Sequence, residues 1–163
     1  MDDTSLQGLV SQLARLLTKR CEMMATVESC TGGLISASCT SISGSSDWFE
    51  RGFVTYSNEA KSTLVGVDPA IIDAHGAVSE PVARAMADGG LRHAPVQWSV
   101  AVTGIAGPTG GSAEKPVGTV WFAWGTPTGV ETEVRVFGGD RASVRAATAA
   151  HALQGLLERI EDA

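Results

Sequence analysis

The segment Glu28-Ser29-Cys30-Thr31-Gly32-Gly33 carries the strongest local signal in this chain. It follows the apolar run 23–27 and precedes a second run at 34–37, a pattern that predicts a strand, a tight turn and a helix. Such a turn lies at the carboxyl end of a strand, where open α/β sheets bind ligands and the first N–H groups of a helix attract negative charge. Because its two glycines let a ligand approach the backbone closely, we expect the serine and the cysteine to face that ligand.

A purely structural interpretation of this segment stays open. The side chains of Glu28, Ser29 and Thr31 are of the kind that caps a helix, and the glycines would then pack the helix on the sheet. Short motifs have modest specificity. The segment alone therefore does not decide between a ligand site and a helix cap.

Composition predicts one globular domain spanning 1–163. Hydrophobic residues make up 44% of the 163 residues and charged residues 18%, enough for a real core without disulfides or metals. The formal net charge of −6 excludes a global basic field, so we expect no nucleic-acid partner. An anionic ligand would need a local cluster of cations.

The cysteines and histidines indicate a cytoplasmic protein without a metal or other cofactor. Three cysteines lack CxxC spacing, and no signal-peptide pattern opens the chain. No stretch approaches the ~20 apolar residues that span a bilayer, so we expect no membrane partner. The three histidines, at 75, 93 and 151, form neither an HExxH motif nor a Cys/His pair.

The order of predicted elements indicates a three-layer α/β/α sandwich with a mixed, mostly parallel central sheet. Apolar residues at helical spacing predict a helix from Thr4 to Arg20. Turn, cap and strand signals then predict, in order, a strand at 23–27, a helix at 31–41, a strand at 48–57 bulged at Gly52, helices at 58–66, 68–76 and 79–92, strands at 97–103, 117–126 and 130–137, and a last helix at 140–161.

Lys61 is the best candidate to accept a proton from a serine nucleophile. No histidine lies in a matching motif, so a Ser-His-Asp triad has little support. Burial and the positive end of a helix both lower the pKa of a lysine, and Lys61 lies in the first turn of a predicted helix. Tyr56, five residues earlier, would orient the lysine or relay a proton. The alternative is that both are ordinary surface side chains.

The turn offers two further groups for such chemistry. Backbone amides around Thr31 and Gly32 would form an oxyanion hole. Cys30 at a helix N-terminus is an alternative nucleophile, but it is equally typical of a small buried residue.

The glycine-rich segment 103–111, TGIAGPTGG, suits a phosphate or a ring held by successive N–H groups. It lacks the GK[ST] ending of a Walker motif. Lys115, Arg141 and Arg145 would supply the cations, and the two arginines share one face of the last helix. A solvated helix face and a flexible hairpin loop are the alternative.

Six segments, in order and across nearly the whole chain, resemble the C-terminal domain of the CinA (competence/damage-inducible) family. They are ESCTGG, GFVTYSNEAK, HGAVSEPVA, TGIAGPTGG, KPVGTVWFA and GDRASVR. The resemblance implies a metal-independent Ser/Lys amidohydrolase that converts nicotinamide mononucleotide to nicotinate mononucleotide and ammonia in pyridine-nucleotide recycling. It also implies that the N-terminal domain of longer CinA proteins is absent.

The resemblance further implies roles for individual residues. Ser29 is the nucleophile, Lys61 the general base, Tyr56 and Thr103 support them, and Arg145 contacts the substrate, with Arg141 as the alternative phosphate ligand. The full set of predicted substrate contacts is Cys30, Thr31, Gly32, Gly33, Thr103, Gly104, Gly107, Arg141 and Arg145.

Two other functions stay open. One is a non-catalytic nucleotide-binding or regulatory module that keeps the same pocket, and the other is a cysteine hydrolase that uses Cys30. We expect a homodimer or higher homo-oligomer, because small α/β enzymes commonly associate symmetrically. Trp48, Trp121 and Trp124 would lie either in its interface or in the core.

Overall fold

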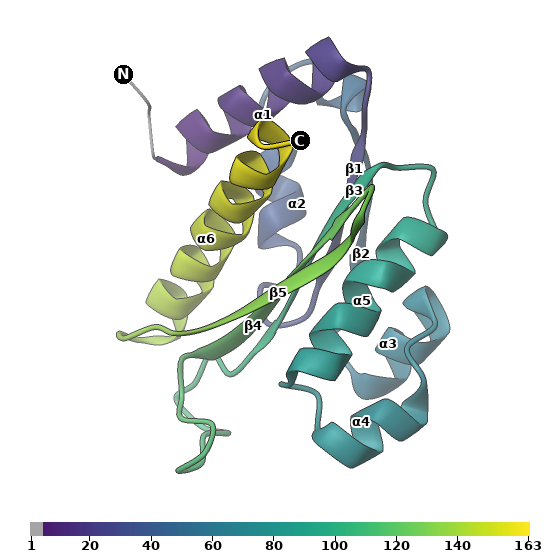
Figure 1. Ribbon diagram of the computed structural model, residues 1–163. Coiled ribbons are helices and arrows are strands. Elements are labelled where there is room, and N and C mark those ends of the chain that lie inside the picture. Colours follow the sequence, from purple (N-terminus) through teal and green to yellow (C-terminus); the bar gives the residue numbers. More distant parts are fainter. Residues whose placement is uncertain (1–4) are drawn as a thin grey trace.

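A five-stranded mixed sheet forms the middle layer of the structure, a computed structural model that describes residues 5–163 (Figure 1). The strands lie in the order β2-β1-β3-β4-β5. Their bounds are β1 (Met24–Glu28), β2 (Phe49–Val54), β3 (Trp98–Gly104), β4 (Thr119–Thr126) and β5 (Gly129–Val136). β1 is parallel to β2 and β3, while β4 is antiparallel to both β3 and β5. Only β4 therefore opposes the common strand direction among the described residues, which confirms the mixed, mostly parallel sheet.

Helices cover both faces of this sheet, as Figure 1 shows. One face carries α1 (Leu6–Arg20), α2 (Leu34–Cys39) and α6 (Arg141–Glu161). The other carries α3 (Asn58–Val65), α4 (Pro69–His75) and α5 (Glu80–Arg92). A short 3₁₀ turn, Ser45–Asp47, precedes β2. The three-layer α/β/α sandwich is confirmed, whereas Thr4, the expected start of the first helix, lies outside the described residues.

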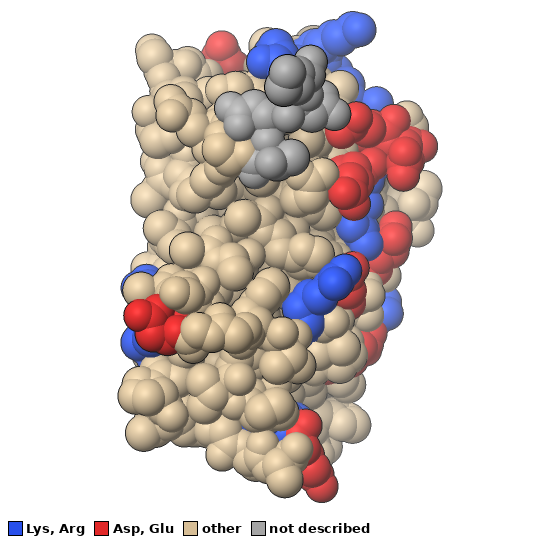
Figure 2. All heavy atoms as spheres, turned by 90° about the vertical axis from the view of Figure 1, so that its left-hand side faces the viewer, with Lys and Arg blue, Asp and Glu red and all other residues tan. Residues whose placement is uncertain are grey.

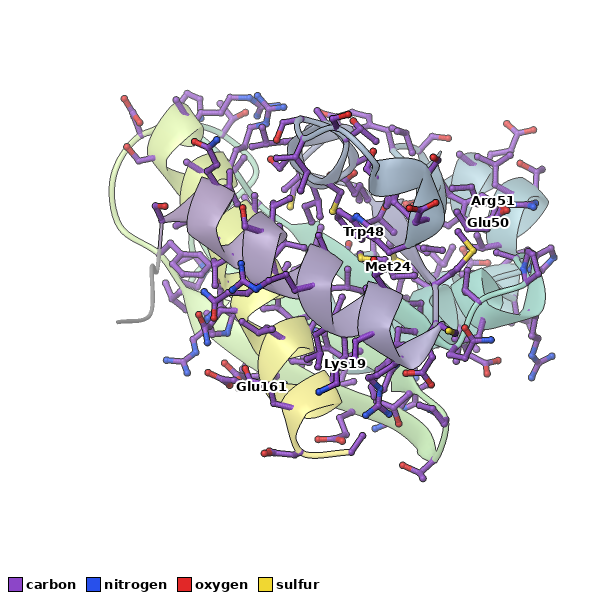
Figure 3. All side chains as sticks on the ribbon, turned by 90° about the horizontal axis from the view of Figure 1, so that it is seen from above. Lys19, Met24, Trp48, Glu50, Arg51 and Glu161 are labelled. Carbon is purple, nitrogen blue, oxygen red and sulfur yellow. The ribbon has the colours of Figure 1, made fainter. Side chains whose placement is uncertain are left out.

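The layer of α1 and α6 has a largely uncharged outer side. Figure 2 shows this side, with acidic and basic side chains gathered mainly along its borders. In the view from above, α1 crosses α6, and Lys19 and Glu161 lie on the outer surface of the two helices (Figure 3). None of the helices in residues 5–163 has the length and hydrophobicity needed to cross a membrane.

The tryptophans belong mainly to the core. Trp48 and Trp124 are buried between the sheet and the α1–α6 layer, and Figure 3 shows Trp48 close to Met24 of β1. Trp121 is half-buried on the opposite face. Trp48 and Trp124 are therefore unavailable to a subunit interface, and the expected homodimer stays a prediction.

Local capping signals predicted α3, α4 and α5 well, but α2 is shorter than expected. Gly32 and Gly33 have φ angles of 59° and 109°, which an α-helix does not allow, so the helix of 31–41 starts only at Leu34. Near its other end, the Ser38, Thr40 and Ser41 hydroxyls donate to backbone carbonyls.

β2 is also shorter than the predicted strand 48–57, and its irregularity is not at Gly52. The register with β1 shifts between Phe49 and Arg51 instead. Gly52 has a packing role, because a Cβ there would lie 2.3 Å from Ser36 Oγ on α2.

Gly155 of α6 allows a similarly close approach to Trp124. An added Cβ would lie 2.3 Å from the indole ring, whose Nε1 donates to the Ala152 carbonyl at 2.9 Å. We expect Gly155→Ala to lower the free energy of unfolding by about 1–2 kcal/mol, because overpacking outweighs the gain in helix propensity. Urea denaturation measures this.

The matched control is Gly138→Ala, where an added Cβ meets no atom within 4 Å. Its effect should stay below about 0.5 kcal/mol. Equal stabilities of the two variants would contradict tight packing at Gly155.

Candidate functional site

The side chain of Glu28 fixes the turn between β1 and α2. Its buried carboxylate accepts the Ile35 N–H at 2.8 Å and the Ser36 N–H at 2.9 Å, so it caps α2 from the end of the strand. The hydroxyls of Thr31 and Ser36 donate to the same carboxylate at 2.6 and 2.7 Å. The capping interpretation is therefore correct for Glu28, and Thr31 supports the cap only by donating to Glu28. The Ser29 hydroxyl takes no part in the cap and instead contacts the Tyr56 carbonyl and the Lys61 amine.

The backbone of Glu28 also places the second half of the site. Its carbonyl accepts the Thr55 N–H at 2.8 Å, which extends the contact between β1 and β2 past Val54. The chain then turns at Ser57, whose side chain caps α3 by accepting the Ala60 N–H. This path brings the first turn of α3 to the carboxyl end of β1.

Lys61 lies in that first turn with its amine directed at Ser29. The residue is 1% exposed, and its Nζ lies 3.2 Å from Ser29 Oγ. The Thr55 and Tyr56 carbonyls accept from Nζ at 3.0 and 3.2 Å, and the Ser57 carbonyl lies at 3.5 Å. No carboxylate among residues 5–163 pairs with this amine.

This arrangement suits a neutral amine. Burial lowers the pKa of Lys61 and outweighs an opposing electrostatic effect of Cys30. A neutral amine has two N–H bonds and one lone pair. In the structure Nζ donates to Ser29 Oγ, and the Ser29 hydroxyl donates to the Tyr56 carbonyl at 3.4 Å. In the neutral amine, the Thr55 and Tyr56 carbonyls can accept from the two N–H groups, and the lone pair is then directed at the Ser29 hydroxyl.

A small cavity opens over this pair. It has a volume of about 240 Å³ and is lined by Ser29, Cys30, Tyr56, Asn58, Lys61, Ala77, Val78, Thr103, Gly104, Ala106 and Arg141. A larger hollow of about 460 Å³ between α1 and α2 has no ionisable side chain in its lining, so it offers no comparable chemistry. The described residues contain no group of three or more His, Cys, Asp or Glu side chains suited to a metal ion.

The cavity lining agrees only in part with the predicted substrate contacts. Cys30, Thr103, Gly104 and Arg141 line it, whereas Thr31, Gly32, Gly33, Gly107 and Arg145 do not. Four further residues line the cavity although they were not expected there, namely Asn58, Ala77, Val78 and Ala106. Asn58 lies within the segment GFVTYSNEAK, three residues before Lys61, and this position could have predicted that it lines the same cavity.

Tyr56 contacts Lys61 through its backbone. The carbonyl accepts from Nζ, while the exposed hydroxyl accepts from Arg141 Nη2 at 3.4 Å. Thr103 Oγ1 donates to the Ala77 carbonyl at 2.9 Å and so links β3 to the segment after α4. Lys115 lies away from the cavity lining and donates to the His75 carbonyl at the end of α4.

The amides of the turn are not all available to an oxyanion. The Gly32 N–H, one of the expected donors, already donates to the Ser29 carbonyl at 3.1 Å. Thr31 is fully buried. The N–H of Cys30 makes no hydrogen bond to another described residue and belongs to a residue that lines the cavity, so it is the better candidate.

The thiol of Cys30 is a poor nucleophile in this environment. Burial raises its pKa to about 11, so the thiol stays protonated at neutral pH. Although Cys30 lines the cavity, the group in hydrogen-bond contact with the Lys61 amine is Ser29 Oγ.

The Glu28 cap gives a stability prediction. In Glu28→Gln the amide nitrogen replaces one acceptor, and at least one buried donor among the α2 amides and the two hydroxyls loses its partner. We expect the free energy of unfolding to fall by about 1–3 kcal/mol in chemical denaturation.

Glu59→Gln serves as the control, because Glu59 is an exposed residue in the first turn of α3. Its effect should stay below about 0.5 kcal/mol. A Glu28→Gln protein as stable as this control would show that the carboxylate does not hold the turn.

Comparison with known proteins places this site in a family. The model of the CinA C-terminal domain matches residues 6–160. The chain is 51% identical over 160 residues to the nicotinamide-nucleotide amidohydrolase PncC of Escherichia coli K12, covering 98% of this chain and 97% of that protein. It is 47% identical to the protein of the same name from Pseudomonas putida, covering 92% and 94% of the two chains.

Solved structures agree with this result. The competence/damage inducible protein CihA of Agrobacterium tumefaciens is 43% identical, with a TM-score of 0.92 and 94% of both chains covered. The competence damage-inducible protein A (ComA) of Klebsiella pneumoniae is 36% identical, with a TM-score of 0.93 over 96% of this chain and 98% of that one. The chain therefore belongs to the CinA C-terminal domain family, as its six sequence segments predict.

Proposed function

We propose that this protein hydrolyses the carboxamide of nicotinamide mononucleotide to nicotinate mononucleotide and ammonia, with Ser29 as nucleophile and Lys61 as general base. The observation that carries the proposal is the 3.2 Å contact between the buried Lys61 amine and Ser29 Oγ in the cavity lining. The names of the E. coli and P. putida relatives support the substrate and the place in pyridine-nucleotide recycling.

The first chemical step follows from the contacts of the two residues. Lys61 accepts the Ser29 proton as Oγ bonds to the carboxamide carbon, and the carbonyl oxygen becomes an oxyanion. The Cys30 N–H, next to the nucleophile in the chain and at the cavity, is our candidate donor for that charge. The positive pyridinium ring makes the carboxamide carbon more electrophilic.

The second half of the reaction returns the proton. As the C–N bond breaks, Lys61 gives its proton to the departing nitrogen, and ammonia leaves an ester on Ser29. Water then attacks this ester, Lys61 again accepts a proton and returns it to Ser29 Oγ, and the carboxylate product leaves. The contact of Lys61 Nζ with Ser29 Oγ favours Lys61 as the proton donor, since the Tyr56 hydroxyl is exposed and has no hydrogen bond to Ser29.

Arg141 is the best candidate for the phosphate of the substrate. Besides Lys61 it is the only cationic side chain in the cavity lining formed by the described residues. A planar guanidinium binds phosphate oxygens in pairs. Binding at the phosphate would hold the carboxamide over Ser29 and so supply positioning energy.

Ammonia release from nicotinamide mononucleotide, measured with a chelator present, tests the proposal. We expect wild-type turnover to survive chelation and to fall by about 10³-fold or more in Ser29→Ala and in Lys61→Met, because each variant removes one partner of the pair. Circular dichroism checks that the variants are folded, and intact mass checks that each carries only the intended substitution.

Cys30→Ser is the matched control beside the nucleophile. It should keep at least a tenth of the wild-type rate, since no step requires the thiol. Retained turnover in Ser29→Ala together with loss in Cys30→Ser would support a cysteine hydrolase. Binding of nicotinamide mononucleotide without ammonia release by wild-type protein would support the non-catalytic binding module.

A further inference from the structure

We propose that Arg145 is a positioning residue for the turn 29–33 between β1 and α2, which we call the Ser29 turn, and that it does not bind the phosphate of the substrate. This inference rests on the proposed function. It arises from the different contacts of the two arginines that share one face of α6.

Arg145 holds the carbonyl groups on the outside of the turn. Its Nε donates to the Cys30 carbonyl at 3.2 Å and its Nη2 to the Thr31 carbonyl at 2.9 Å. An added Cβ at Gly32 would lie 3.6 Å from Nη2, so the guanidinium also packs against the glycine. Arg145 is half-buried and lies outside the cavity lining, which leaves it poorly placed for a ligand in the cavity.

The contacts of Arg145 fix the orientation of the peptide group that follows Ser29. With the Cys30 and Thr31 carbonyls held, the Gly32 N–H meets the Ser29 carbonyl at 3.1 Å. That bond fixes the peptide plane between Ser29 and Cys30. In a planar trans peptide the N–H points away from the carbonyl, so the direction of the Cys30 N–H is fixed as well.

Arg141, one turn earlier, has a different set of contacts. Its Nη1 donates to the Gly107 carbonyl at 3.0 Å and its Nη2 to the Tyr56 hydroxyl at 3.4 Å. The first two turns of α6 therefore contact three segments. Arg141, which lines the cavity, contacts the glycine-rich loop and the segment before α3. Arg145, which lies outside the cavity lining, contacts the Ser29 turn.

A substrate that lacks the phosphate distinguishes the two possible roles of Arg145, positioning of the Ser29 turn and binding of the phosphate. We expect Arg145→Ala to lower kcat by about 10- to 100-fold, with KM changed less than about threefold, because small displacements of reacting groups cost rates of this size. The same loss of kcat should occur with nicotinamide riboside, which has no phosphate. Arg145→Lys should recover little, because lysine keeps the charge but not the rigid two-donor geometry.

The rate at which a fluorophosphonate labels Ser29 gives a readout that needs no substrate. We expect labelling to slow by a similar factor in Arg145→Ala and to stay at the wild-type rate in Arg92→Ala, which removes an exposed arginine that pairs with Asp88. Circular dichroism and thermal melting of the Arg145 variants check that they are folded.

Three results would overturn the proposal. They are a loss confined to the phosphate-bearing substrate, a rise in KM with kcat unchanged, and wild-type labelling of Ser29 in Arg145→Ala. If wild-type protein is labelled but releases no ammonia from nicotinamide mononucleotide, the proposed function fails, whereas the labelling comparison still decides the role of Arg145.

Discussion

The buried carboxylate of Glu28 is the constraint on which the rest of this site depends. A buried charge is stable only where hydrogen bonds replace its water, and here two α2 amides and two hydroxyls do so. The same residue accepts the Thr55 N–H through its backbone carbonyl. One position at the end of β1 thus sets the turn that carries Ser29 and the path that leads to Lys61.

The buried amine of Lys61 gives this scaffold its proposed chemistry. A lysine placed in a buried site without a carboxylate partner has a lowered pKa, because its charged form loses hydration. The Thr55 and Tyr56 carbonyls make its shortest backbone contacts, with the Ser57 carbonyl farther away, and hold the amine beside Ser29 Oγ. Catalysis by this pair requires that the turn and the first part of α3 keep their relative position, and hydrogen bonds within the protein supply that rigidity.

Local signals in the sequence predicted the fold, because each element carries its own cap or turn residue. The pairing of Ser29 with Lys61 was instead implied by the resemblance of six segments to a family, since the spacing of the two residues left ordinary surface side chains as an alternative. Asp68 and Asp140, for example, cap the helices that they were expected to start. The separate contacts of Arg141 and Arg145 were not predictable, since both lie on one face of α6 and their partners are more than 30 residues distant in sequence. The availability of turn amides likewise depends on bonds such as that between Gly32 and Ser29, which only the three-dimensional structure defines.

The most direct test of this account is the titration of the Lys61 amine itself. The chain has only three lysines, Lys19, Lys61 and Lys115, so ¹³C-labelled lysine gives three Cε signals by NMR, and Lys61→Met assigns the one of interest. The account predicts that this signal titrates with a pKa below the ordinary lysine value of 10.5. A pKa at or above that value would show that the carbonyls hold Lys61 as an ammonium ion, and would contradict its role as the base for Ser29.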